Sequence, residues 1–113
     1  MGTETTEVIV VFMTAANNAE AARLAEMLVG ERLAACVQIL PEMESVYRWQ
    51  GQIERQKEVL LIAKTLASKF EALEREVRAL HSYETPEIVA LPLAAGSSAY
   101  LAWLSAAVTG KDS

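Results

Sequence analysis

The stretch SVYRWQGQIERQKEVLLIAKT, residues 45–65, decides the fold. Strand-forming residues lie on both sides of Gln50 and Gly51, and this arrangement predicts two strands joined by a tight turn. The second strand changes along its length, because residues 53–58 are mostly polar and residues 59–65 are mostly apolar. The polar half cannot lie in the core of its own domain. We therefore expect the two strands to continue beyond the sheet as a projecting ribbon.

A strand and a helix are expected ahead of the ribbon. Residues 7–14 (EVIVVFMT) form a run rich in β-branched residues, which predicts a buried strand. Asn17 then begins a helix over residues 17–31, because Glu20 follows it at the spacing of a capping box. Gly30 lies near the end of this helix, where a left-handed residue is often required.

A second helix and the last core strand are expected after the ribbon. Ser68 and Glu71 have the spacing of another capping box. The helix that they begin should end near His81, because Pro86 disfavours helical structure just before it. Residues 87–93 (EIVALPL) then predict the strand.

Two further elements complete the pattern. Residues 33–40 (LAACVQIL) predict a strand that Pro41 interrupts, since proline has no N–H to donate to a ladder. Residues 96–108 predict a C-terminal helix capped by Ser97 or Ser98.

The order of elements is β-α-β-β-α-β with an added C-terminal helix, which is the ferredoxin-like α+β pattern. Right-handed crossovers put both main helices on one face of a four-stranded antiparallel sheet. The other face then needs cover, and the third helix and a neighbouring subunit can supply it. We expect one domain over residues 1–113, with flexible tails at 1–6 and 109–113.

Composition restricts the class of protein. The chain has 113 residues, 52% of them hydrophobic, and a net charge of -5. The acidic balance argues against a nucleic-acid or anionic-membrane partner, which would need a basic face. The longest apolar run, near residues 59–63, is too short to cross a bilayer, and no basic residue precedes the first apolar segment. A cytoplasmic location is therefore expected. A single cysteine, Cys36, excludes an intrachain disulfide.

Five motifs follow one another along the chain, namely ERLAACVQI, SVYRWQGQIE, EVLLIAKT, LHSYETPEIVALPL and YLAWL. In this order they resemble the signature blocks of the CutA family of divalent-cation tolerance proteins. The resemblance runs from about Val8 to Leu104. It implies a ferredoxin-like subunit and a tight homotrimer built by strand pairing, similar to the PII signalling proteins. It also implies a non-enzymatic role in tolerance of copper and other divalent metals.

The same resemblance bears on metal binding. Some bacterial members carry a cysteine where this chain has Met13, and two adjacent histidines where it has Leu80 and His81. The candidate metal ligands are therefore His81 and Met13, and we expect copper or another divalent metal to bind weakly, with no organic cofactor. The alternatives are that His81 is a solvated residue at a helix end and that Met13 fills space in the core.

Two groups of residues are candidates for lining a cleft. Tyr47 and Trp49 share one face of the ribbon, where they form either a stacking wall or, as we favour, a contact between subunits. Tyr83, Glu84 and Glu87 flank a proline and form either a simple helix-to-strand junction or a polar wall.

Lys64 ends the most apolar strand of the sequence. Its ammonium group must reach water or find a carboxylate, and Glu58, Glu84 and Glu87 are the candidate partners. In a cleft, Lys64 would offer its charge to a small anionic ligand.

These candidate cleft residues suggest an alternative to the metal-tolerance function. The alternative is a PII-like sensor that binds a small molecule or anion in clefts between subunits. The chain has five glycines and no glycine-rich loop, so nucleotide binding has little support. An enzyme is disfavoured, because no Ser-His-Asp set, local Cys-His pair or phosphate loop is present in the sequence.

Overall fold

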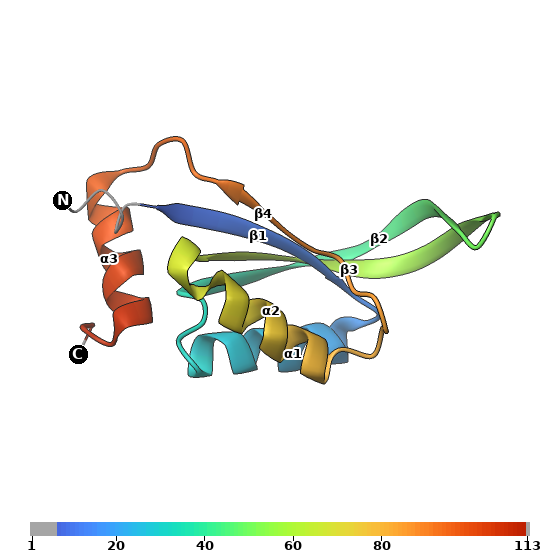
Figure 1. Ribbon diagram of the computed structural model, residues 1–113, viewed down its shortest axis with the longest axis horizontal. Coiled ribbons are helices and arrows are strands. Elements are labelled where there is room, and N and C mark those ends of the chain that lie inside the picture. Colours follow the sequence, from blue (N-terminus) through green and yellow to red (C-terminus); the bar gives the residue numbers. More distant parts are fainter. Residues whose placement is uncertain (1–6, 113) are drawn as a thin grey trace.

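The computed structural model describes residues 7–112. One four-stranded sheet has the strand order β2-β3-β1-β4, and every neighbouring pair is antiparallel. Helices α1 and α2 cover one face of the sheet (Figure 1). This is the expected ferredoxin-like arrangement. The elements are β1 (Val8–Ala15), α1 (Asn18–Gly30), β2 (Cys36–Trp49), β3 (Gln52–Leu66), the 3-10 turn η2 (Ala67–Lys69), α2 (Phe70–Leu80), β4 (Ile88–Pro92) and α3 (Ser98–Thr109).

Helix α1 begins as its sequence predicts. The Asn17 side chain accepts a hydrogen bond from the N–H of Glu20. The return bond of the capping box is different, because the Glu20 carboxylate accepts from the N–H of Ala16. The left-handed residue after the helix is Arg32, with φ 58°, and the expectation for Gly30 was wrong.

Helix α2 does not begin with the predicted capping box. Ser68 lies inside the 3-10 turn, and Lys69 precedes the helix without a side-chain cap. The N–H of Ala67 donates to the carbonyl of Glu7 at 2.9 Å, so pairing with the first strand extends up to the turn. The helix follows that turn directly. It ends at Leu80, as expected from the proline that follows.

Strand β2 is one strand where the sequence predicted two. Pro41 is accommodated by a shift of register between Leu40 and Met43. Because β2 is an edge strand, a residue without an N–H costs little there. Gln50 and Gly51 both have positive φ, which suits the tight turn of a hairpin. The ribbon of β2 and β3 projects far beyond the helices, as expected (Figure 1).

The two faces of the sheet are buried to different degrees. Alternate residues of β1 and β3 face α1 and α2 and form the main core, whose largest fully buried members are Met13, Leu24, Leu28, Leu61 and Leu73. The buried strand predicted over residues 7–14 is more deeply buried on one face than on the other. The period-two alternation of a strand turns Val10, Phe12, Leu60 and Ile62 to the opposite face, where they are half-buried.

Helix α3 covers one end of that opposite face. It packs Leu104 and Val108 against Val8, Ala35 and Leu66 in a second, smaller core. The Ser97 side chain caps the helix by accepting from the N–H of Tyr100. The remaining part of this face is uncovered within the subunit, and we call it the open face.

The flexibility of the two expected tails stays a prediction. Residues 1–6 lie outside the described residues. At the other end, Thr109 closes α3, and Arg32 donates to the carbonyl of Ala107 within the helix and to the carboxylate of Asp112 after it.

Candidate functional site

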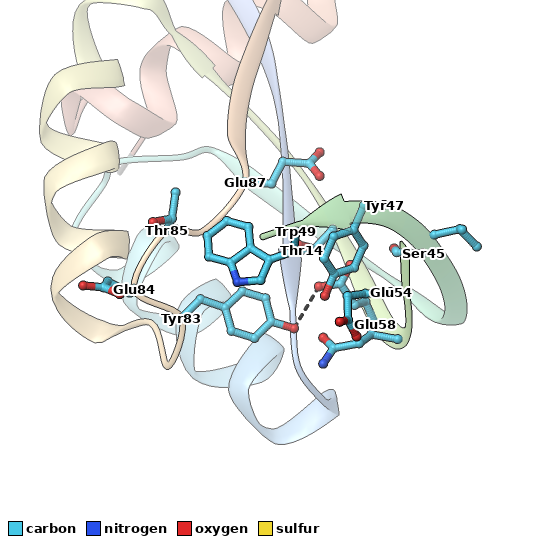
Figure 2. Close-up of a pocket in the computed structure, with 12 residues that line it drawn as sticks. Thr14, Ser45, Tyr47, Trp49, Glu54, Glu58, Tyr83, Glu84, Thr85 and Glu87 are labelled. Carbon is cyan, nitrogen blue, oxygen red and sulfur yellow. Dashed lines mark hydrogen bonds between the residues drawn. The ribbon is translucent and has the colours of Figure 1, made fainter. Parts of the chain in front are cut away.

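A cleft of about 770 Å³ runs along one face of the ribbon, from Thr14 and Glu58 at its base to Trp49 beside the turn, and we call it the ribbon cleft. Its lining comes from β1, from both strands of the ribbon and from the loop between α2 and β4 (Figure 2). The lining residues are Thr14, Ser45, Val46, Tyr47, Trp49, Glu54, Gln56, Glu58, Tyr83, Glu84, Thr85 and Glu87.

The strand register explains how the ribbon supplies half of this lining. Tyr47 lies opposite Glu54, and Ser45 lies opposite Gln56. Residues directly opposite each other in an antiparallel pair share a face, and so do residues two apart along a strand. Tyr47 and Trp49 of β2 therefore share one face of the ribbon with Glu54 and Gln56 of β3.

The ribbon cleft is strongly acidic. Four of its lining residues are glutamates, namely Glu54, Glu58, Glu84 and Glu87. None of the described residues that line it is lysine, arginine or histidine. Charges of one sign around a concave surface attract ions of the opposite sign and repel ions of the same sign. The cleft therefore suits cations.

Glu58 is the most buried of these carboxylates, with 7% of the residue exposed. The Tyr83 hydroxyl donates to its Oε2 atom at 2.8 Å. Burial raises the pKa of Tyr83, and the hydrogen bond and negative charge of Glu58 raise it further, so Tyr83 remains a donor at all ordinary pH values. Within residues 7–112, Oε1 of Glu58 has no hydrogen-bond donor and no ion pair.

His81 precedes the loop segment that lines the cleft, and its side chain is fully buried. Its Nε2 atom lies 2.7 Å from the carbonyl oxygen of Thr14, and its Nδ1 atom accepts from the N–H of Tyr83 at 2.9 Å. A carbonyl can only accept, so Nε2 carries the proton of the neutral ring. The His81 ring also lies 4.7 Å from the Tyr83 ring, centroid to centroid. His81 therefore positions Tyr83 toward the cleft.

Glu20 fixes the same loop from α1. Its carboxylate accepts from the N–H of Ala16 at 2.8 Å and from the N–H of Ser82 at 2.6 Å. Burial raises the pKa of Glu20, but these hydrogen bonds outweigh burial and hold the pKa below its ordinary value. The sequence identified Glu20 only as a helix cap. Its bond to Ser82 joins segments that no local pattern connects.

The structure does not bring His81 and Met13 together as an open metal site. Both nitrogens of neutral His81 are already engaged, so neither has a free lone pair for a metal. Met13 is fully buried in the core under α1 and α2. The described residues contain no group of three or more His, Cys, Asp or Glu side chains placed to hold one metal ion. A tightly chelated metal does not fit these residues.

Lys64 lies away from the ribbon cleft. Its Nζ atom donates to Oε1 of Gln38 at 2.8 Å and lies 5.9 Å from the centre of the Tyr100 ring. It lines a separate apolar cavity of about 170 Å³ beside α3. Glu58 is six residues away on the same strand, which is about 20 Å. The structure therefore does not pair Lys64 with Glu58, which accepts a hydrogen bond from Tyr83.

The other five candidate cleft residues lie together in one lining, namely Tyr47, Trp49, Tyr83, Glu84 and Glu87. The sequence-based interpretation missed Glu54 and Gln56, and it gave Glu58 another role. The signal was available in the polar half of β3, where every second residue shares the face of Tyr47 across the turn.

The fold and cleft together define a small α+β protein with a ferredoxin-like sheet, a projecting ribbon and an acidic, aromatic cleft along one face of that ribbon. Residues 9–107 match the sequence model of the family described as "CutA1 divalent ion tolerance protein". The chain belongs to this family.

Individual relatives agree with this assignment. The "Divalent-cation tolerance protein CutA" of Thermus thermophilus is 50% identical over 84% of this chain and 92% of its own length. "Protein CutA, chloroplastic" of Arabidopsis thaliana is 48% identical over 85% of this chain, which spans only 53% of that protein. The crystal structure of CutA1 from Oryza sativa superposes with a TM-score of 0.89 at 44% identity, covering 93% of this chain and 96% of that one.

No helix within residues 7–112 is long and apolar enough to span a membrane.

Proposed function

We propose that this protein serves divalent-cation tolerance without catalysis, by binding divalent metal ions weakly in the ribbon cleft. One observation carries the proposal, which is that four glutamates line one cleft with no lysine, arginine or histidine among its described lining residues. Carboxylate oxygens are ligands for hard divalent ions and also bind zinc and copper. The family to which the chain belongs is described by divalent ion tolerance.

Weak rather than tight binding follows from how the ligands are spread. A dedicated site needs three or four ligands around one ion, and the described residues contain no such group. His81 can ligate only after giving up its bond to Thr14 or to Tyr83. The cleft carboxylates are therefore the more accessible ligands.

Calorimetry on tag-free protein with copper(II) and zinc(II) tests this proposal. We expect micromolar or weaker binding that falls further in the double variant Glu58→Gln/Glu84→Gln. Glu71→Gln, an exposed glutamate in the first turn of α2, is the matched control and should leave binding unchanged. Nanomolar affinity that persists in the double variant would overturn the assignment to the cleft. Parallel titration of His81→Ala tests the alternative ligand directly.

We further infer that the working form is a cytoplasmic homotrimer. The support is the open face together with the exposed apolar residues of β4 and the ribbon, where Val89, Leu91 and Ile53 are 50%, 54% and 67% exposed. Strands β2 and β4 also lie at the two edges of the sheet, and unpaired edges favour pairing with another chain. Subunit contacts would cover both features.

The ribbon cleft gives no support to a small anionic ligand. Lys64, the residue expected to hold the anion, lines another cavity. The four carboxylates would repel an anion from the cleft itself.

A further inference from the structure

Glu58 is a nearly buried carboxylate that has one hydrogen bond and no countercharge within residues 7–112. Buried carboxylates in proteins are paired or hydrogen-bonded, because taking a charge out of water is costly. Glu58 is only 7% exposed, yet Tyr83 is its one recorded side-chain partner within residues 7–112. Its Oε1 atom has no hydrogen-bond partner within residues 7–112 and is not fully buried. This atom is therefore reachable from the cleft that the residue lines. A cationic group entering the cleft would complete its hydrogen bonding.

The size of the cleft and the spread of its carboxylates select the kind of cation. A volume of about 770 Å³ is that of a site for an organic molecule and far exceeds the need of a single ion. Glu54 and Glu58 come from the ribbon, whereas Glu84 and Glu87 come from the loop before β4 (Figure 2). These groups do not converge as ligands for one ion. A flexible molecule with two or more separated positive charges can reach both walls.

Aromatic rings supply the second element of recognition. Tyr47, Trp49 and Tyr83 all line the same cleft (Figure 2). Within a single subunit Tyr47 and Trp49 are 37% and 50% exposed, so a ligand that enters the cleft of that subunit meets both rings. Ammonium groups bind over aromatic faces, most strongly over tryptophan, and a methylene chain between them gains from contact with the same rings.

We propose that the ribbon cleft binds a linear organic di- or polyamine. One ammonium group donates to Oε1 of Glu58, a second pairs with Glu84 or Glu87, and the methylene chain lies along Trp49 and Tyr47. The inference deepens the proposed function, because both place a cation in the same cleft. It differs in requiring the aromatic wall, which a bare metal ion does not use.

Spermidine is the probe, and calorimetry with the full chain at fixed ionic strength is the measurement. We expect saturable binding that weakens about tenfold in Glu58→Gln, corresponding to the loss of one charge-assisted hydrogen bond. Trp49→Leu keeps an apolar side chain but removes the aromatic face, and it should weaken binding several-fold. Trp103→Leu, on α3 outside the cleft and 47% exposed, is the matched control and should bind as the unmodified chain does. The uncharged diol 1,8-octanediol should not bind.

Fluorescence gives an independent readout. In the Trp103→Phe background Trp49 is the sole tryptophan, since the chain has two. Its emission should shift and saturate with spermidine at the same concentrations as the calorimetric signal. Circular dichroism and light scattering on each variant confirm that fold and assembly are retained.

The outcomes separate the two proposals. Spermidine binding that is equal in Glu58→Gln, Trp49→Leu and the unmodified chain would show surface charge attraction only and would overturn the inference. Copper or zinc binding without any spermidine binding would also overturn it and leave the proposed function standing. Spermidine binding without metal binding would support the inference and overturn the metal-binding proposal.

Discussion

At the scale of single residues, Glu20 links the first helix to the loop that forms one wall of the cleft. The residue is 2% exposed, and its carboxylate accepts hydrogen bonds from the backbone N–H groups of Ala16 and Ser82. Its pKa is therefore lowered below the ordinary value of 4.5. A group whose pKa is depressed by folding stabilises the folded state at any pH above its unfolded value. That contribution is lost as the pH falls through the folded value.

The substitution Glu20→Gln should show this dependence. An amide can replace only one accepting oxygen, so one N–H loses its partner and the free energy of unfolding at pH 7 should fall by about 1–3 kcal/mol. The difference from the unmodified chain should shrink below pH 4.5, as the native carboxyl takes up a proton. Urea denaturation at pH 7 and pH 3 measures it, with exposed Glu71→Gln as control. An equal difference at both pH values would show that the carboxylate charge is irrelevant.

The histidine shows why residue-scale roles were hard to predict. The sequence offered His81 as a metal ligand or as a solvated helix end. In the fold its side chain is fully buried and hydrogen-bonded to the carbonyl of Thr14, 67 residues away. Local pattern carries no information on such a contact. By contrast Tyr47 and Trp49 could be assigned to one face of the ribbon, because that follows from strand periodicity alone.

At the scale of elements, the turn of the ribbon has glutamine at position 50, where the backbone conformation favours a different residue type. Gln50 has φ 52°, a left-handed conformation that costs a residue with a side chain about 1–2 kcal/mol. Asparagine tolerates this region better. Gln50→Asn should therefore raise the free energy of unfolding by up to about 1 kcal/mol.

Thermal denaturation followed by circular dichroism measures the effect of that change. Gln52→Asn is the matched control, because Gln52 lies in the extended strand that follows the turn. Asparagine is disfavoured in strands, so the control should be neutral or slightly destabilising. A loss of stability in Gln50→Asn would mean that the Gln50 side chain makes a contact which outweighs its backbone strain.

Element boundaries were predictable where a strong local signal marked them. Asn17 caps α1, and the proline after α2 marks its end. The prediction that Ser68 caps α2 was wrong, because pairing of the preceding strand continues to Ala67. The prediction that Pro41 interrupts the strand was also wrong, because an edge strand with a shifted register accommodates a proline.

At the scale of the whole molecule, the order of elements was enough to predict the sheet and the helices on one face. The cover that the third helix gives to the other face was also predicted, and α3 provides it at one end of the sheet. Which strand residues stay uncovered was not predicted, because an apolar run shows only that residues avoid water and not which neighbour covers them. Val10, Phe12, Leu60 and Ile62 lie on the open face and not in the main core. The cleft composition was also hidden, since it depends on how the ribbon faces a loop more than 20 residues further along.

The open face provides the test of assembly. Leu91 is 54% exposed on β4, and it lies opposite Val10 of β1 on the sheet. A lysine there remains solvated in a free subunit but becomes a buried charge in a subunit contact. The unmodified chain should therefore sediment as a trimer, and Leu91→Lys should shift toward smaller species while its far-ultraviolet circular dichroism is retained.

The control for this experiment is Val29→Lys, which places the same charge on an exposed residue of α1. It lies on the helical layer and should leave the sedimentation coefficient unchanged. A monomer mass for the unmodified chain at micromolar concentration would overturn the homotrimer, and a fully trimeric Leu91→Lys would move the contact away from β4. In the latter case the ribbon, where Ile53 is 67% exposed, becomes the surface that joins the subunits. Ile53→Lys then replaces Leu91→Lys as the substitution that should separate them.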